Sequence, residues 1–433
     1  MRSIRAGGKI GATKKPSGNV RPLSQISAVR RIAGRARACA PRDFGSRDFW
    51  RLWYTGLVSF MVRWIETLAV AVFVFRHSHS PFAVAMIAML RLLPMGLFGA
   101  FLGAWAERIE RRTALAAMIM ATLLTDVALA ALACAGALTV WDVAVGSFVN
   151  GLAWAADNPV RRVAMGEAVG VEQMSTAMSV DVAANNGSRM LGPVIGGLVL
   201  AGAGIAGVYA LGIVLYATSL VAVLGLGLRS QASGRARVPV LPGIAEGLRL
   251  ARQHQKLFGT LVVTVIYNLF AWPFTSMVPV IAQGHLALGA AGTGALASMD
   301  GLGALLGALV VAVAVRQQHY GKVYIGGFIV YSAMVIAFAL SPAPPPAGAA
   351  LVLEGIGGSG YSIMQATLVY LYAPPEMRSR LLGLLSVCIG VGPLGFLQLG
   401  LLADMIGAQW ATVATGIEGL MALALTYPLW RVL

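Results

Sequence analysis

Long apolar runs, separated by short polar segments, dominate the chain after residue 52. Each run has about 20 residues or more, which is the length that a helix needs to cross the hydrocarbon core of a bilayer. One long interruption, residues 229–256, leaves six runs on either side. The pattern therefore predicts an all-α polytopic membrane protein with twelve transmembrane helices in two six-helix lobes, near 53–75, 82–106, 113–138, 141–162, 175–201, 205–228, 257–283, 291–315, 322–340, 347–373, 379–403 and 407–431.

Two segments lie outside these runs and set the predicted domain limits. Residues 1–51 contain 13 Lys and Arg, two acids and many Gly, Ser and Pro. Such a segment cannot bury a core, so we expect a disordered basic tail that either contacts anionic lipid headgroups or is a passive topogenic segment. Lobes are expected at 52–228 and 257–433, joined by a linker at 229–256 whose second half reads as an amphipathic surface helix.

Composition and charge agree with a membrane location. The chain is 58% hydrophobic and only 12% charged, about half the charge of a typical soluble domain. Its net charge is +16, and all but four of the 33 Lys and Arg fall into segments that the helix assignment places on one side. This positive-inside asymmetry predicts a multi-pass protein of a bacterial-type inner membrane, with both termini cytoplasmic and with lipid, not nucleic acid, as its partner.

Metal and disulfide chemistry are not expected. Cys39, Cys134 and Cys388 are scattered and form no paired pattern. His77 and His79 form a loop pair without a nearby carboxylate or cysteine, which is the pattern of a polar loop. Walker A, H-E-x-x-H and G-x-S-x-G signatures are absent from the sequence, so we expect neither an enzyme nor a cofactor.

The two halves carry similar motifs. The fifth run contains Gly192-Pro193-Val-Ile-Gly196-Gly197, and the eleventh contains Gly392-Pro393-Leu-Gly395. Parallel repeats of this kind occur in transporters that bind their substrate between the halves, near the middle of the membrane. The repeat therefore predicts a central site between the lobes.

The loop after the second run, from Gly103 to Arg112, resembles the loop 2–3 signature of the major facilitator superfamily, with Glu107 and Glu110 in place of the usual Asp and Gly. Ser188 to Gly197 is similar to that superfamily's antiporter motif, with Ser188 in place of its first glycine. Other segments look like the branch of enterobactin exporters and drug efflux pumps. The resemblance implies a major facilitator fold that works as a monomer, a span-5 motif of Ser188, Arg189, Gly192, Pro193, Gly196 and Gly197, and an inner gate of Gly103, Glu107, Arg108, Arg111, Arg112, Asp157, Arg378 and Arg380.

Charged side chains within the runs are candidate functional groups, since each costs about 2.5–3.5 kcal/mol at the bilayer centre. Glu66 is expected to carry a proton or face substrate, and Arg63, three residues earlier, to pair with it or to anchor an anionic substrate. Further candidates for the proton-coupling and substrate cavity are Asp300, Glu354, Arg91, Asn268 and Trp272. Asp126 and Glu418 lie in spans that are peripheral in the superfamily, so structural pairing is expected for them, and Arg189 is expected to support packing.

Together these features predict a secondary transporter that exports a hydrophobic drug-like or siderophore-like small molecule in exchange for protons. Two alternatives remain open from the sequence. A proton symporter could import a small solute, although the antiporter-like motif argues against it. A non-transporting membrane receptor or scaffold could signal through the basic tail.

Overall fold

The computed structural model describes residues 46–106, 110–170, 173–227, 240–374 and 377–433, and the regular elements in these ranges are all helical. The all-α prediction is confirmed. The predicted basic tail lies outside the described residues except for its last six positions. In chain order the elements are α2 (Arg47–Ser78), α3 (Pro81–Ala106), α4 (Arg111–Cys134), α5 (Val140–Val169), α6 (Met174–Leu224), α7 (Val240–Gln253), α8 (Gln255–Ile266), η1 (Tyr267–Ala271), η2 (Trp272–Ser276), α9 (Met277–Gly284), α10 (Ala290–Ala314), η3 (Gln317–His319), α11 (Tyr320–Ala339), α12 (Pro344–Tyr372), α13 (Arg378–Ile389), α14 (Gly392–Ile406), α15 (Ala408–Leu425) and α16 (Tyr427–Trp430).

Local signals explain where the helices of the first half turn. Gly136, with φ +68°, follows the end of α4. Thr139 then opens α5 with a capping box, because its hydroxyl accepts from the Asp142 N–H while Asp142 accepts from the Thr139 N–H. In α6, Gly204 has φ +65°, a conformation that favours glycine, and it separates the two crossings predicted at 175–201 and 205–228.

Two crossings of the second half are not continuous α-helices. The crossing predicted at 257–283 runs through α8, a π-helical turn, a 3₁₀ turn beginning at Trp272 and Pro273, and α9. The crossing predicted at 379–403 is divided into α13 and α14 just before Gly392-Pro393. Proline lacks the N–H that a continuous helix needs, which accounts for a break at each place.

Eight stretches of the described residues are long and apolar enough to cross a membrane, and α6 with 51 residues is long enough to cross twice. The helix set is consistent with the twelve predicted crossings. The predicted linker helix is α7, which packs on α13 and α8. We call the end of the bundle that carries Arg51, Arg111, Arg162, Lys256 and Arg378 the basic end, and the other end, with Arg76, the opposite end.

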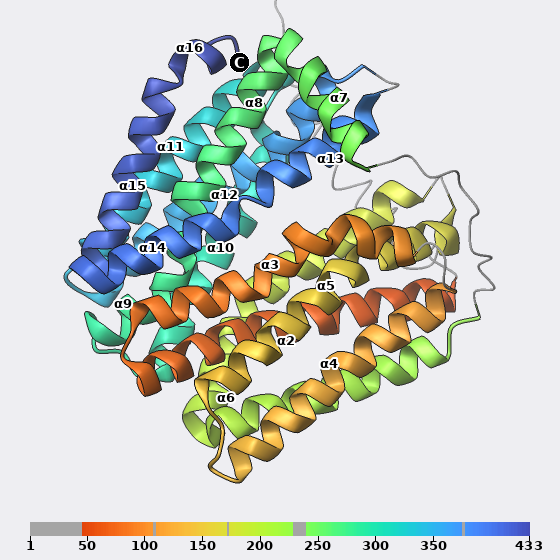
Figure 1. Ribbon diagram of the computed structural model, residues 1–433, viewed down its shortest axis with the longest axis vertical. Coiled ribbons are helices and arrows are strands. Elements are labelled where there is room, and N and C mark those ends of the chain that lie inside the picture. Colours follow the sequence, from red (N-terminus) through yellow and green to blue (C-terminus); the bar gives the residue numbers. More distant parts are fainter. Residues whose placement is uncertain (1–45, 107–109, 171–172, 228–239, 375–376) are drawn as a thin grey trace, which may run out of the picture. The chain divides into compact units, whose positions relative to one another are not determined.

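The helices gather into two groups, α2 to α6 and α8 to α15 (Figure 1). Within the first group, α2 packs along α6 and α3 along α5; within the second, α12 packs between α10 and α11. The groups meet along two seams, where α6 packs on α10 and α3 packs on α14. This arrangement places a candidate site between the two groups.

Candidate functional site

The two seams hold the halves together from the opposite end to the middle of the bundle. Along α6 and α10, an added Cβ at Gly197 would lie 2.6 Å from the Ala290 carbonyl oxygen, and one at Gly294 would lie 2.3 Å from that of Pro193. Only glycine permits backbones to come this close. Arg76 Nε also donates to Gln283 Oε1 at 2.9 Å across the opposite end.

The second seam follows the same course. At its outer part, a Cβ added at Gly400 would lie 2.9 Å from Ala85 Cβ, and near the middle one at Gly96 would lie 3.3 Å from the Gly390 carbonyl oxygen. In the described part of the chain, α5 and α12, which reach the basic end from the two halves, are not packed against each other. Among the described residues, the packing between the halves therefore lies at the opposite end and in the middle of the bundle, and α5 and α12 do not extend it to the basic end.

A cavity of about 410 Å³ lies between the halves. This volume is within the range of small-molecule sites, about 300–1,000 Å³. Most of its wall is apolar or aromatic, with a few charged and amide groups from both halves. Its polar and aromatic lining includes Arg63, Trp64, Arg91, Trp154, Asn185, Arg189, Tyr267, Asn268, Trp272, Asp300, Tyr361, Gln365 and Phe396.

Glu66 lies behind this wall in a cluster of polar side chains. Its side chain is 1% exposed, and its Oε2 accepts a hydrogen bond from Asn150 Nδ2 at 2.9 Å and one from Arg91 Nη2 at 3.4 Å. Its Oε1 has no hydrogen-bond partner among the described residues. A Cβ added at Gly212 would lie 3.5 Å from that oxygen and 2.5 Å from Asp126 Oδ2, so the two acids face the same spot.

The structure changes the partners that we predicted around Glu66. Arg63 does not pair with Glu66, because its guanidinium lies 3.6 Å from the centre of the Trp154 ring and Arg91 supplies the ion pair instead. Asp126, for which structural pairing is expected, is fully buried beside Glu66. Arg91 lines the cavity and also pairs with a carboxylate from a neighbouring helix.

A second acidic cluster joins the halves through Arg189 and Asp300. Arg189 Nε and Nη2 donate to Asp300 Oδ2 and Oδ1 at 2.9 and 2.8 Å, a bidentate pair between α6 and α10. Glu354, the eleventh residue of α12, is fully buried next to Asp300. Arg189 therefore does more than support packing, because it lines the cavity and links the two halves.

Aromatic side chains from the interrupted seventh crossing form one wall of the cavity. Tyr267 stacks on Tyr361 with ring centroids 3.8 Å apart, and Trp272 meets Phe396 edge-on at 5.7 Å. Asn268 donates to the Thr264 carbonyl within its own helix at 2.8 Å. Asn268 and Trp272 line the cavity as predicted residues of the central site. π-Helical turns such as η1 are frequent at functional sites.

The span-5 motif packs α6 between two other helices. A Cβ at Gly192 would lie 2.5 Å from Trp64 Cβ, and one at Gly196 would lie 2.8 Å from the Ile65 carbonyl oxygen, so both glycines face α2. Gly197 faces α10 in the other half. Ser188 is fully buried and Pro193 lies in the α10 contact. The motif therefore sets how closely α6 approaches both its own half and the other one.

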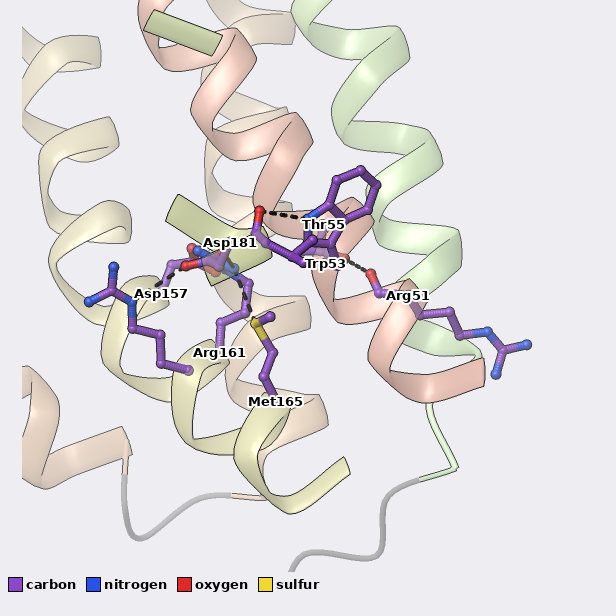
Figure 2. A network of polar contacts seen from close by, with 9 residues as sticks. Arg51, Trp53, Thr55, Asp157, Arg161, Met165 and Asp181 are labelled. Carbon is purple, nitrogen blue, oxygen red and sulfur yellow. Dashed lines mark hydrogen bonds and ion pairs between the residues drawn. The ribbon is translucent and has the colours of Figure 1, made fainter. Parts of the chain in front are cut away.

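A buried charge network lies near the basic end of the first half, and Figure 2 shows Arg161 at its centre. Arg161 is fully buried; its Nη1 donates to Asp181 and its Nε lies 3.5 Å from Asp157 Oδ2. Arg162 also reaches Asp181, at 3.5 Å. A Cβ at Gly56 would lie 2.2 Å from Arg161 Nη1, so α2 presses directly on the guanidinium.

The predicted inner gate is only partly visible. Glu107 and Arg108 lie outside the described residues, and Gly103 is in the last turns of α3. Asp157 pairs with Arg161 and Arg111 pairs with Glu167. Arg112 Nη1 donates to the Leu226 carbonyl at 3.5 Å, Arg378 Nη1 donates to the Tyr370 hydroxyl at 3.1 Å, and Arg380 Nη1 contacts Met377 Sδ at 3.5 Å.

Asn150 and Asp181 were not predicted as site residues, and neither was the position of Arg161 at the centre of the buried charge network. The crossing predicted at 141–162 ends at the basic pair at 161–162, whereas α5 continues through Pro159 to Val169. Asn150 gave a usable signal, because it is an amide in the middle of an apolar run. By contrast, Glu418 accepts a hydrogen bond from Gln398 at 2.7 Å, in agreement with its predicted structural pairing.

Comparisons with known proteins add the following similarities. A family model described as transmembrane secretion effector matches residues 38–431. Macrolide efflux protein A of Streptococcus pyogenes is 21% identical over 383 residues, which cover 83% of this chain and 90% of that protein. The solved structure of a mutant of the nucleoside transporter NupG has a TM-score of 0.71 at 12% identity and covers 88% of this chain and 99% of its own. A bacterial homologue of the human lysosomal transporter Spinster, inward-facing and unoccupied, has a TM-score of 0.68 at 14% identity, covering 90% and 98%. At these identities the structures show the fold alone.

Proposed function

This chain belongs to the transmembrane secretion effector family of the major facilitator superfamily, and we propose that it exports a hydrophobic drug-like or siderophore-like small molecule in exchange for protons. It is a membrane transporter of that superfamily's type. The export direction is supported by the efflux relative and by the span-5 motif. The basic end is assigned to the cytoplasm, following the positive-inside rule.

The main support for this proposal is a cavity that is large enough for a small molecule and is separated from a buried acid by a single side chain. The cavity of about 410 Å³ is joined to Glu66 through Arg91, which lines the cavity and contacts the acid. In this state the seams close the opposite end, so substrate enters from the basic end. Alternating access requires these seams to open while contacts form at the basic end.

Proton binding is assigned to the Glu66–Asp126 pair. Both acids are buried, and three of their four carboxyl oxygens have no hydrogen-bond partner among the described residues. Two facing carboxylates with one arginine leave a buried negative charge, which is costly in a low-dielectric interior. One proton on the pair neutralises the cluster. Exchange follows when substrate release and proton binding occur in one state, and proton release and substrate binding in the other.

Replacing Glu66 with glutamine tests this assignment. Purified protein in proteoliposomes, under an imposed pH gradient, would be assayed with a labelled macrolide and with ethidium as probes. We expect Glu66→Gln to abolish uphill transport of any probe that the wild type moves, while downhill exchange of that probe persists. Glu418→Gln is the matched control, because it also neutralises an acid within a crossing but lies away from the cavity. Uphill transport at the wild-type rate by Glu66→Gln would exclude Glu66 as the coupling acid.

A further inference from the structure

A second, smaller chamber lies inside the first half, beside the central cavity. It has a volume of about 30 Å³ and is lined by residues of α2, α3, α4, α5 and α6. Arg63, Arg91 and Trp154 line both this side chamber and the central cavity, so the two spaces adjoin at these residues. The remaining lining includes Ser59, Thr122, Asn150, Asp157 and Tyr216.

Buried polar atoms without partners gather on this chamber. Asn150 Oδ1, Trp154 Nε1 and Asp157 Oδ1 are buried and have no hydrogen-bond partner among the described residues. Asn150 and Asp157 are only 8% and 5% exposed. Leaving a buried polar atom unsatisfied costs about 1–3 kcal/mol, so such atoms normally bind ordered water. The chamber is therefore built to hold water.

The three groups lie on one face of α5. Asn150, Trp154 and Asp157 follow at intervals of four and three residues, which places them above one another along a helix. The seven steps from Asn150 to Asp157 span about 10 Å at 1.5 Å per residue. A buried water needs roughly 10–15 Å³ of such volume, so the chamber has room for about two waters. Two waters and the side chains can bridge that distance.

The chamber connects Glu66 to the basic end. Asn150 uses its Nδ2 to hold Glu66, and its Oδ1 is left for the chamber. The two carboxylate oxygens of Asp157 also differ in their partners. Oδ2 lies 3.5 Å from Arg161 Nε, and Oδ1 has no partner among the described residues. One turn further on, Arg162 is 45% exposed. Figure 2 shows Asp157 next to this charge network.

We propose that the side chamber is a proton-release path, running from Glu66 past Asn150 through water to Asp157 and separate from the path of the substrate. This inference rests on the proposed proton exchange. The Glu66–Asp126 pair gives one proton to the chamber water, and the remaining carboxylate of Glu66 pairs with Arg91. The water gives that proton to the Asp157 carboxylate, which passes it to solvent at the basic end. No group is left with an altered charge except the Glu66–Asp126 pair.

The charges around the chamber suit release rather than storage. Arg63 and Arg91 both line it, and only Arg91 has an ion-pair partner among the described residues. Two cations make the chamber unfavourable for an excess proton, so a proton entering it moves on to the one carboxylate in its wall, Asp157. A separate exit keeps the proton from competing with substrate for space in the central cavity.

Hydrogen–deuterium exchange of the buried carboxyl group tests the path without any substrate. Purified protein in lipid would be transferred from H₂O to D₂O while the carbonyl stretch of the protonated carboxyl is followed by infrared spectroscopy. The band is assigned as the one lost in Glu66→Gln. We expect Ser59→Leu, which fills the chamber, and Asp157→Asn, which removes the acceptor, to slow its exchange by about tenfold or more, because proton transfer needs a continuous hydrogen-bonded route. Ser179→Leu is the matched control, since it makes the same change at an exposed position of α6.

Each outcome decides the proposal. Slow exchange in Ser59→Leu and Asp157→Asn, with wild-type exchange in Ser179→Leu, supports it. Wild-type exchange in Ser59→Leu and Asp157→Asn, or the absence of any band that depends on Glu66, overturns it. Thermal stability of the variants, followed by tryptophan fluorescence, separates a blocked path from a misfolded protein. The transport assay of Glu66→Gln does not depend on these exchange rates. The proposed export can therefore be refuted while the release path is supported, and the release path can be refuted while the proposed export is supported.

Discussion

Replacing Gly56 with alanine should destabilise the first half by displacing Arg161. The added Cβ would lie 2.2 Å from Arg161 Nη1 and 2.5 Å from Cζ. Restoring a contact of about 3.5 Å moves the guanidinium by more than 1 Å, away from the Asp181 carboxylate that Nη1 binds. The side chain has no free space to use, because it is fully buried between Asp157, Asp181 and the Phe60 ring.

The magnitude follows from the burial of the pair. Breaking a buried ion pair costs about 3–5 kcal/mol, whereas the gain in helix propensity from Gly to Ala is only about 1 kcal/mol. Gly56→Ala should therefore lower the free energy of unfolding by about 2–4 kcal/mol. The measurement is reversible unfolding in mixed SDS and detergent micelles, followed by tryptophan fluorescence. Gly187→Ala in α6 is the matched control, because a Cβ there meets nothing within 4 Å, and it should be neutral or slightly stabilising.

The same substitution in a charge-free background shows whether the ion pair is the cause. In the variant Arg161→Met, Asp157→Asn, Asp181→Asn, a flexible thioether replaces the guanidinium, and Gly56→Ala should cost less than about 1 kcal/mol. A double-mutant cycle then gives a coupling energy of about 2–3 kcal/mol. Equal costs in both backgrounds, or a Gly56→Ala protein as stable as Gly187→Ala, would refute the reasoning.

Two further predictions concern the seam between α6 and α10. Reversing either charge of the Arg189–Asp300 pair should lower ethidium or macrolide transport at least about tenfold, equivalent to 1.4 kcal/mol. Exchanging the two charges should restore part of the transport, and no recovery in the exchanged pair would contradict a direct interaction. Arg316→Asp, at an exposed position, is the control. Gly197→Leu should push α6 and α10 apart at the opposite end, since even a Cβ there would lie 2.6 Å from the Ala290 carbonyl oxygen. Maleimide labelling of a Gln283→Cys variant, with the native cysteines replaced by serine, should then become about tenfold faster, whereas Gly202→Leu, which meets nothing within 4 Å, should leave the rate unchanged.

Most of the helices could be predicted because the signal for a membrane crossing is local. The length of an apolar run fixes the helix, and proline or glycine marks its ends. The first helix begins at Arg47, not near residue 53, because Phe49 and Leu52 bury fully within a segment that looks polar in the sequence. The break between α13 and α14 had a visible signal in Gly390, Gly392 and Pro393, and only its effect on the helix was missed.

Charge partners were predicted less well because they depend on contacts between helices. A spacing of three residues places Arg63 and Glu66 near one face, yet Arg63 turns to Trp154 while Glu66 turns into the first half. When a helix is apolar on every side, its sequence does not indicate which face packs against a neighbouring helix. The position of Asp126 beside Glu66 could therefore not be predicted. Arg161 lies at the end of the crossing predicted at 141–162, and only the continuation of α5 past residue 162 buries it.

The two acidic clusters share a feature that links charge to movement of the halves. In each cluster, two acids face one arginine: Glu66 and Asp126 face Arg91, and Asp300 and Glu354 face Arg189. Arg91 belongs to α3 and Arg189 to α6, and these are the helices that form the two seams with the other half. Opening a seam must move its helix, and with it the arginine that balances the acids. A cluster that loses its arginine takes up one more proton, because buried negative charge without a partner is costly, and a cluster that regains it gives that proton up. The proposed exchange therefore needs no separate relay between proton and conformation, since each arginine belongs to both.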